Sequence, residues 1–135
     1  DLKALHLLLA EDNELNAEIA VTLLEEQGAK ITAVTNGKET LEAIQNAAPR
    51  TYDAILMDVM MPEMNGLEAT RCIRAFEGKG PDEGTPIIAM TANVFADDVK
   101  ACLDAGMNSH VGKPLDMKIL MAEILKYTNR TRSIC

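Results

Sequence analysis

Three carboxylates stand at the ends of two apolar segments, and their placement indicates the chemistry of this chain. Asp58 closes the apolar run 54–57, and Glu11 and Asp12 follow the run 7–10. An ionised carboxylate at the end of a buried strand is unfavourable unless a cation or a metal offsets its charge. The carboxyl ends of parallel strands meet at one edge of an α/β sheet, where ligands bind. Three carboxylates there predict a hard cation, because Mg²⁺ prefers oxygen ligands of this kind.

Two further polar residues fall at expected strand ends. Thr91 ends the run 86–90, and Lys113 follows the short run 108–111. Each feature is common by itself, since a strand-end threonine often pairs locally and an acidic pair often precedes a helix because of the helix dipole. Acid, acid, hydroxyl and amine at one sheet edge form a more specific combination than any single member.

Apolar runs alternate with helical patterns five times along the chain. The runs predict strands over residues 5–10, 30–35, 52–58, 86–91 and 108–111. Helical spacing predicts helices over about 13–27 and 38–47, then after Gly66, around 95–105 and from Asp116. In the third helix this spacing places Ala69, Cys72, Ile73 and Phe76 on the inward face. The alternation predicts an α/β fold, a doubly wound parallel sheet with helices on both faces.

Length and composition indicate one folded domain. The chain has 135 residues, of which 47% are hydrophobic, and a chain of this size can bury a sufficient core without disulfides or metals. We expect a single domain over residues 1–128 and a tail or linker over 129–135. Because the chain begins with Asp1 rather than Met, we expect an excised piece of a larger protein.

The charge balance excludes two classes of partner. The net charge is −8, from 21 acidic and 13 basic residues, which argues against nucleic acid and against an anionic membrane surface. The three cysteines are widely spaced, which favours reduced thiols. No apolar run approaches the ~20 residues of a spanning helix. We therefore expect a cytoplasmic domain without direct membrane contact.

Together these residues resemble the receiver domain of two-component response regulators, over nearly the whole chain. The resemblance is carried by Glu11-Asp12-Asn13, by MDVMMPEMNG around Asp58, by Thr91-Ala92 and by Gly112-Lys113-Pro114. The stretches NGLEATRCIR and DAGMNSHVGKP are most similar to receivers of hybrid sensor histidine kinases. The resemblance implies a flavodoxin-like fold of five strands in the order 2-1-3-4-5 with five helices.

The resemblance also implies the role of each acidic residue. Asp58 would be the nucleophile that takes a phosphoryl group from a phosphohistidine, giving an acyl phosphate. Glu11, Asp12, Asp58 and the backbone carbonyl of Met60 would hold Mg²⁺, with Mn²⁺ as an alternative. Such a domain catalyses its own phosphotransfer and dephosphorylation and switches conformation to signal.

The remaining motif residues would contact the phosphoryl group, again by resemblance. Lys113 would pair with one phosphoryl oxygen as a point charge, and the Ala92 backbone N–H would donate to another. Thr91 would reach the group after modification and so report it. The bond between Lys113 and Pro114 would be cis.

One position departs from the family pattern. Receivers often place an aromatic switch residue three positions before the lysine, and here that residue is His110. Two interpretations stay open: a surface histidine without a role, or a switch with a polar, titratable ring.

Receivers bind a histidine kinase core or a helical histidine phosphotransfer domain, and we expect the same partners here, with a monomeric isolated domain. By resemblance, Leu15 and Ile19 of the first helix and the segment Pro114-Leu115 would contact the partner. From spacing alone, Leu15 and Ile19 could equally be core residues. A parent kinase could itself be anchored in a membrane.

Rival functions remain to be weighed. A Mg²⁺-dependent phosphohydrolase of the haloacid dehalogenase type needs a second Asp two residues after the nucleophile, where this chain has Met60. A degenerate receiver that only docks is disfavoured because every chemical position is present. Flavin binding is disfavoured by the lack of a phosphate-cradling loop after the first strand and by an aromatic content of 3%.

Overall fold

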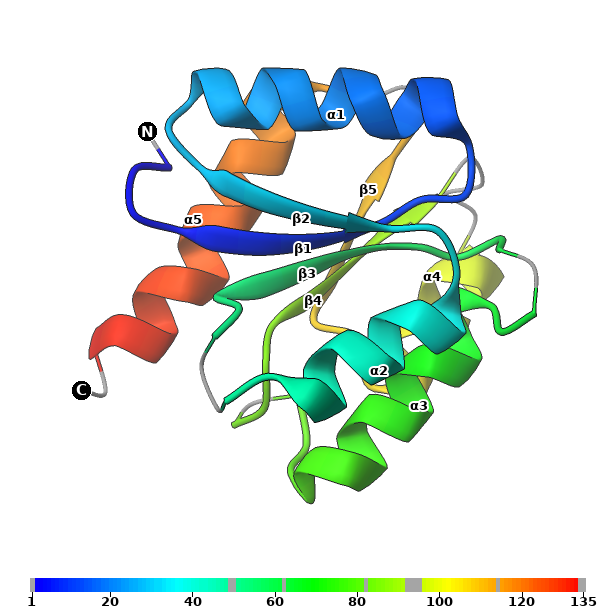
Figure 1. Ribbon diagram of the computed structural model, residues 1–135. Helices are drawn as coiled ribbons and strands as arrows, with labels where there is room; N and C mark the ends of the chain where they lie inside the picture. The colour runs from blue at the N-terminus through cyan, green and yellow to red at the C-terminus, as the bar shows by residue number, and fades with distance from the viewer. Residues whose placement is uncertain are drawn as a thin grey trace.

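The computed structural model shows one parallel sheet covered by helices on both faces (Figure 1). It describes residues 2–48, 51–61, 63–81, 83–91, 96–113 and 115–133, without the side chains of 96–98 and 129–133. The strands are β1 (His6–Ala10), β2 (Lys30–Val34), β3 (Ala54–Asp58), β4 (Ile87–Thr91) and β5 (Ser109–Gly112). The helices are α1 (Glu14–Glu26), α2 (Gly37–Asn46), α3 (Gly66–Glu77), α4 (Ala96–Ala105) and α5 (Met117–Ser133). The strand order β2-β1-β3-β4-β5 confirms the predicted fold class.

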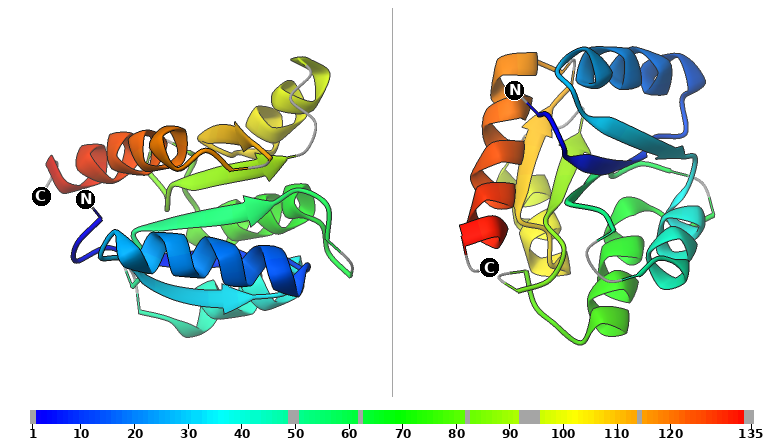
Figure 2. Two further views of the ribbon diagram at one scale, coloured as in Figure 1. Left: turned by 90° about the horizontal axis from the view of Figure 1, so that it is seen from above. Right: turned by 60° about the vertical axis from the view of Figure 1, so that its left-hand side comes forward.

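Each face of the sheet has its own apolar core, because neighbouring residues of a strand point to opposite sides. Leu7 and Leu9 of β1 pack with Leu24 of α1 and Ile124 of α5 on one face. Leu8, between them, packs on the other face with residues of α3 and α4. Figure 2 shows the resulting three layers from two further directions. Strands buried on both faces explain why the sequence shows continuous apolar runs rather than alternation.

The register of the sheet brings its polar strand ends together. Asp58 is paired with Met90 in β4, and Thr91 is paired with Gly112 in β5. Ala10, the last residue of β1, is paired with Met57 of β3. Because all five strands are parallel, the residues that follow these positions lie at one edge.

Helix caps fix where the chain leaves that edge. Asn13, Asn36 and Asn65 precede α1, α2 and α3, and each side-chain oxygen accepts a hydrogen bond from the backbone N–H three residues later, at 2.8–2.9 Å. The expected cap at Asn13 is therefore confirmed. Asp116, also an expected cap, accepts from the N–H of Lys118 at 2.9 Å. Such caps satisfy donors that a helix start would otherwise leave unpaired.

One expectation about the third helix is wrong. Phe76 is not inward, since 53% of its surface is exposed. The buried position near the end of α3 is taken by Arg74, whose side chain finds partners that an aromatic ring could not use. At the other end of the chain, α5 runs to Ser133, and the domain boundary at residue 128 stays a prediction. None of the helices in the described part of the chain has the length and apolar character needed to cross a bilayer.

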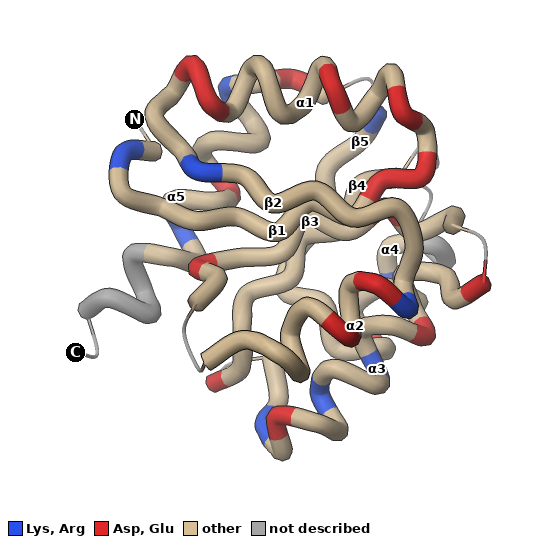
Figure 3. Tube along the Cα trace, in the orientation of Figure 1, with Lys and Arg blue, Asp and Glu red and all other residues tan. Residues whose placement is uncertain are grey.

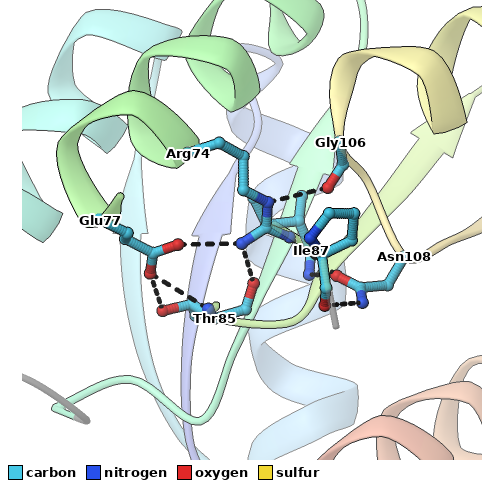
Figure 4. Close-up of polar contacts among 7 residues, drawn as sticks. Arg74, Glu77, Thr85, Ile87, Gly106 and Asn108 are labelled. Carbon is cyan, nitrogen blue, oxygen red and sulfur yellow. Dashed lines mark hydrogen bonds and ion pairs between the residues drawn. The ribbon is translucent and has the colours of Figure 1, made fainter. Parts of the chain in front are cut away.

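Arg74 is buried beside the segments that lead into β4 and β5, at the end of the sheet opposite the carboxylates. Figure 4 shows its polar contacts. Its Nε donates to the carbonyl of Gly106 at 2.9 Å, and Nη1 donates to the carbonyl of Thr85 at 2.8 Å. Nη1 also pairs with the Glu77 carboxylate at 3.0 Å, and Nη2 donates to Asn108 Oδ1 at 2.9 Å. One guanidinium thus joins α3 to the segments that lead into β4 and β5.

Asn108 completes this network. Its Oδ1 also accepts from the backbone N–H of Ile87 at 2.9 Å, and its Nδ2 donates to the carbonyl of Pro81 at 2.7 Å. The starts of β4 and β5 are therefore held by side chains as well as by their own ladder. Buried polar groups of this kind stabilise only while every partner is present.

We expect Arg74→Ala to lower the free energy of unfolding by about 3 kcal/mol, because it leaves half-buried carbonyls and the Glu77 charge without their partner. Arg74→Lys should recover only part of this loss, since one ammonium cannot replace three differently directed nitrogens. Urea unfolding measures both changes.

The matched control is Arg71→Ala, which removes an exposed arginine from the same helix and should change stability by less than about 0.5 kcal/mol. Equal effects of the two alanine substitutions would show that the Arg74 network contributes nothing to the fold.

Candidate functional site

The three predicted carboxylates meet at the carboxyl edge of the sheet. Glu11 and Asp12 follow β1, and Asp58 ends β3; each offers an oxygen, and these atoms lie within 4.8 Å of one another. Glu11 and Asp58 are 4% and 5% exposed, whereas Asp12 is exposed. Two buried acids and one exposed acid therefore bring three carboxylate oxygens close together.

Lys113 supplies the counter-charge to the buried pair. Its Nζ lies 2.9 Å from Glu11 Oε1 and 3.1 Å from Asp58 Oδ2. The position of the ammonium is set by the end of β5, where the Lys113 backbone N–H donates to the carbonyl of Thr91 at 2.8 Å. The structure thus places the predicted amine between two of the predicted acids.

The burial of Asp58 controls its ionisation. The pKa of Asp58 is raised to about 6, because burial and the neighbouring Glu11 raise it more than Lys113 lowers it. Burial also acts against ionisation of Glu11, but hydrogen bonds with Asp58, Lys113 and the Asn13 N–H together lower the pKa of Glu11. Burial likewise opposes the charge of Lys113, and its contacts with Glu11 and Asp58 prevail and raise the lysine pKa. Of the two buried acids, Asp58 is therefore the one that takes up a proton first as the pH falls.

The donor set fits a hard divalent cation. Three carboxylates carry three negative charges at neutral pH and face one ammonium, so excess negative charge remains. All the grouped donor atoms are carboxylate oxygens, which suit Mg²⁺ and Mn²⁺ rather than soft metals. The Met60 side chain is 78% exposed, which agrees with a role for its backbone alone.

The backbone beside Asp58 is tightly folded. The Met60 N–H donates to Asp58 Oδ1 at 3.2 Å, and the Gly66 N–H donates to the carbonyl of Val59 at 3.0 Å. A Cβ on Gly66 would collide with the Asp58 carbonyl oxygen. Glycine at this position therefore lets α3 begin directly against the end of β3, which fixes the loop that carries the acid.

Thr91 and His110 lie on the strands beyond Asp58. Thr91 is 7% exposed at the end of β4, and His110 is half-buried in β5. Ala92 and Pro114 are outside the described residues, so the expected backbone contact of Ala92 and the cis bond at Pro114 remain predictions. The role of His110 as a switch is also still a prediction.

The first helix settles one open alternative. Leu15 is 65% exposed and Ile19 is 51% exposed, while Ala20 and Leu24 on the opposite side are buried. The core interpretation of Leu15 and Ile19 is therefore wrong, and both are free to meet a partner. Leu115 is half-buried and packs against the core beneath α1 and α5.

Sequence reasoning missed the contribution of β2 and the start of α2. The Val34 carbonyl accepts from the Glu11 N–H at 3.1 Å, and the Gly37 N–H donates to the Met64 carbonyl at 2.9 Å. These contacts are made by backbone atoms, so residue chemistry gave no sign of them. The dipeptide Asn36-Gly37 is the only local signal, because it marks a turn or a close backbone approach.

Removing the Asp58 charge should stabilise the metal-free domain at neutral pH. Its folded-state pKa of about 6 lies above the unfolded value of about 3.9. As the pH rises through this window the folded state therefore loses stability, by roughly 3 kcal/mol for a shift of this size. We expect Asp58→Asn in EDTA to raise the free energy of unfolding by this order near neutral pH and to change it little near pH 4.

The exposed Asp104 of α4 gives the control, since Asp104→Asn should have no such pH-dependent effect. Urea unfolding at the two pH values measures both variants. A gain from Asp58→Asn that is equal at both would mean that charge is not its source.

Comparison with known proteins identifies relatives of this arrangement. The model of the response regulator receiver domain matches residues 7–125. Probable histidine kinase 1 of Oryza sativa subsp. indica is 39% identical, over 90% of this chain and 15% of that protein. Sensor protein GacS of Pseudomonas syringae pv. syringae is 37% identical, over 93% of this chain and 14% of that protein. The chain thus spans about one-seventh of the length of these relatives.

Two solved structures are similar throughout. The receiver domain of sensor histidine kinase PA1611 from Pseudomonas aeruginosa PAO1, with magnesium coordinated in its active-site cleft, is 35% identical with a TM-score of 0.81, covering 93% of this chain and 98% of that one. The Saccharomyces cerevisiae complex of the phosphotransfer protein Ypd1 with the Ssk1 receiver domain gives 25% identity and a TM-score of 0.85, covering 97% and 93%. The chain therefore belongs to the family of response regulator receiver domains and serves two-component phosphorelay signalling.

Proposed function

We propose that Asp58 is the phosphoacceptor of this receiver and takes a phosphoryl group from a phosphohistidine of a partner protein. The observation that carries the proposal is the position of its buried carboxylate beside the acids after β1 and 3.1 Å from the ammonium of Lys113. With a pKa of about 6, Asp58 is ionised at neutral pH and can attack as a nucleophile.

The transfer exchanges one bond for another. A carboxylate oxygen of Asp58 attacks phosphorus, a P–O bond forms, and the P–N bond to the donor imidazole breaks. The electron pair of that bond returns to the imidazole nitrogen, so no oxidant or reductant is required. Lys113, which pairs with Asp58 before transfer, then pairs with a phosphoryl oxygen as a point charge.

Glu11, Asp12, Asp58 and the Met60 carbonyl are the residues that would hold Mg²⁺, or Mn²⁺, beside the acceptor. A divalent cation bound there supplies charge neutralisation for the phosphoryl oxygens. Glu11 keeps its own charge because Lys113 and the Asn13 N–H hydrogen-bond to its carboxylate.

Thr91 and Ala92 would read the new group. Thr91 sits at the end of β4 and is paired with Gly112 of β5, so a shift of Thr91 toward the phosphoryl group is passed to β5. The Ala92 N–H would donate to the group while its small side chain leaves the donor access. His110, half-buried in β5, would be the second element of the switch.

The docking surface for the donor would centre on α1, next to the site. Exposed Leu15 and Ile19 border a shallow hollow that Glu18, Thr22 and Leu23 also line. An apolar centre with a polar rim is typical of transient interfaces, and the co-crystal of Ypd1 with a receiver supports a histidine phosphotransfer domain, or the corresponding kinase helices, as the occupant.

The charge of α1 adds to the description of this partner. The helix carries Glu14, Glu18, Glu25 and Glu26 and has no basic residue (Figure 3). A donor with basic residues around its histidine would therefore be steered toward this face. The Pro114-Leu115 segment would extend the contact beyond α1, and the isolated domain would be monomeric.

The acceptor assignment is tested with acetyl phosphate, which needs no partner. Incubation with Mg²⁺ should add one phosphoryl mass to the domain, and Asp58→Asn should abolish the addition because the nucleophilic oxygen is lost. Intact-mass spectrometry measures both. Asp104→Asn, which removes an exposed carboxylate of α4, should be labelled normally. Labelling that survives Asp58→Asn, or that is as fast in EDTA, would contradict the assignment.

Docking is tested by separating two donors. Leu15→Asp should slow transfer from a phosphorylated histidine phosphotransfer domain about tenfold, because a charge enters the dry centre of the interface, and should spare labelling by acetyl phosphate. The matched control is Leu103→Asp on α4, where the leucine is also exposed, at 48%. If both substitutions slow transfer equally, or if Leu15→Asp slows labelling by acetyl phosphate as much, α1 is not the docking surface.

A further inference from the structure

The segment 34–37, which joins β2 to α2, carries none of the site's acids yet contacts both loops that do. At one end, the Val34 carbonyl accepts the N–H of Glu11 at 3.1 Å. At the other end, the Gly37 N–H donates to the Met64 carbonyl at 2.9 Å, in the loop that follows Asp58. The segment therefore connects the loop after β1, which carries Glu11, to the loop after β3, which follows Asp58.

The contact at Gly37 is possible only without a side chain. A Cβ at this position would collide with the Met64 carbonyl oxygen, and it would lie 2.9 Å from the Met64 carbonyl carbon and 3.0 Å from the Asn65 oxygen. All three are backbone atoms, so no change of rotamer could relieve the clash. Glycine here serves a close approach of two backbones, and any larger residue must push the loop away.

The start of α2 is itself rigid. Both the N–H and the hydroxyl of Thr35 donate to Glu39 at 2.8 Å, and the Glu39 N–H donates to Asn36 Oδ1 at 2.8 Å. This reciprocal cap fixes the first turn of the helix. The fully buried Thr40 adds a hydrogen bond from its hydroxyl to the Asn36 carbonyl at 2.8 Å. Gly37 therefore presents its N–H from a fixed frame.

The loop on the other side transmits any displacement to the acid. Only a few residues separate Met64 from Asp58, and the Gly66 N–H closes the loop on the Val59 carbonyl at 3.0 Å. The Met60 N–H touches the reacting carboxylate itself, at 3.2 Å from Asp58 Oδ1. A shift of Met64 thus moves the Met60 backbone and the environment of Asp58 together.

We propose that Gly37 is a positioning residue for the metal site, acting through its close contact with the Met64 carbonyl. This inference rests on the proposed function, in which the loop supplies Asp58 and the Met60 carbonyl to a divalent cation. Gly37 touches no reacting atom. Its contribution is to set the distance between the loop after β3 and the acids after β1. The start of α2 supports that loop from outside the site.

The first test measures Mg²⁺ affinity rather than phosphorylation. Gly37→Ala should raise the Kd for Mg²⁺, measured by calorimetry on the unphosphorylated domain, about tenfold, as expected when a residue that orients ligands is lost. The matched control is Gly80→Ala, because a Cβ there meets nothing within 4 Å and the Kd should not change. A folded Gly37→Ala domain with the wild-type Kd would overturn the inference.

The wild-type domain gives a second test that needs no substitution and decides the matter if Gly37→Ala fails to fold. Coupling between metal binding and formation of the Gly37–Met64 hydrogen bond is reciprocal. If the hydrogen bond strengthens Mg²⁺ binding by some factor, bound Mg²⁺ must stabilise the hydrogen bond by the same factor. Exchange of the Gly37 amide hydrogen should slow about tenfold with saturating Mg²⁺. The Gly84 amide, bonded to the Gly80 carbonyl at 2.8 Å far from the site, should not respond.

The outcomes separate the two proposals. Unchanged exchange at Gly37 in a domain that binds Mg²⁺ would overturn the positioning role and leave the proposed function intact. A wild-type domain that binds no Mg²⁺ at its carboxylates would instead contradict the proposed metal site, and with it this inference.

Discussion

The repulsion between two buried carboxylates is the constraint on which the rest of this site depends. Glu11 and Asp58 are almost fully buried and share one ammonium, Lys113. At a separation of about 4 Å, two like charges in a partly buried setting repel by about 4 kcal/mol, which several ordinary hydrogen bonds are needed to offset. Burial, with this repulsion added to it, raises the pKa of Asp58 to about 6. The same crowding makes the edge receptive to a divalent cation.

A site under this repulsion needs a backbone that cannot spread apart. Parallel strands fix where Glu11 and Asp58 emerge, and glycines let the neighbouring segments approach closely. Gly66 admits α3 against the Asp58 carbonyl, and Gly37 admits α2 against the Met64 carbonyl. The loops that carry the acids are thereby held by main-chain contacts, which leaves the side chains available for the cation and the phosphoryl group.

The two ends of the sheet divide stability from function. At the amino ends of β4 and β5, Arg74 and Asn108 donate to half-buried carbonyls and bond to each other. At the carboxyl ends, Thr91 and Lys113 stand beside acids whose charges are incompletely balanced. A satisfied hydrogen-bond network resists rearrangement, whereas a site with excess charge changes its preferred arrangement when a charged ligand binds. In the proposed switch, a change at Asp58 would therefore move the carboxyl ends of β4 and β5 while their amino ends stay anchored.

The sequence by itself predicted the fold class, and its resemblance to a known family predicted the strand order. It also identified the three carboxylates, Thr91 and Lys113 as candidate site residues, because hydrophobic period, strand-end chemistry and motif spacing are local properties. Only the tertiary structure showed that Leu15, Ile19 and Phe76 are exposed and that Arg74 is buried. Helical spacing identifies the apolar face of a helix but not how much of that face the neighbouring elements cover. The tertiary structure also decided that Gly37 braces the loop after β3, because a contact between two backbones leaves no trace in side-chain chemistry.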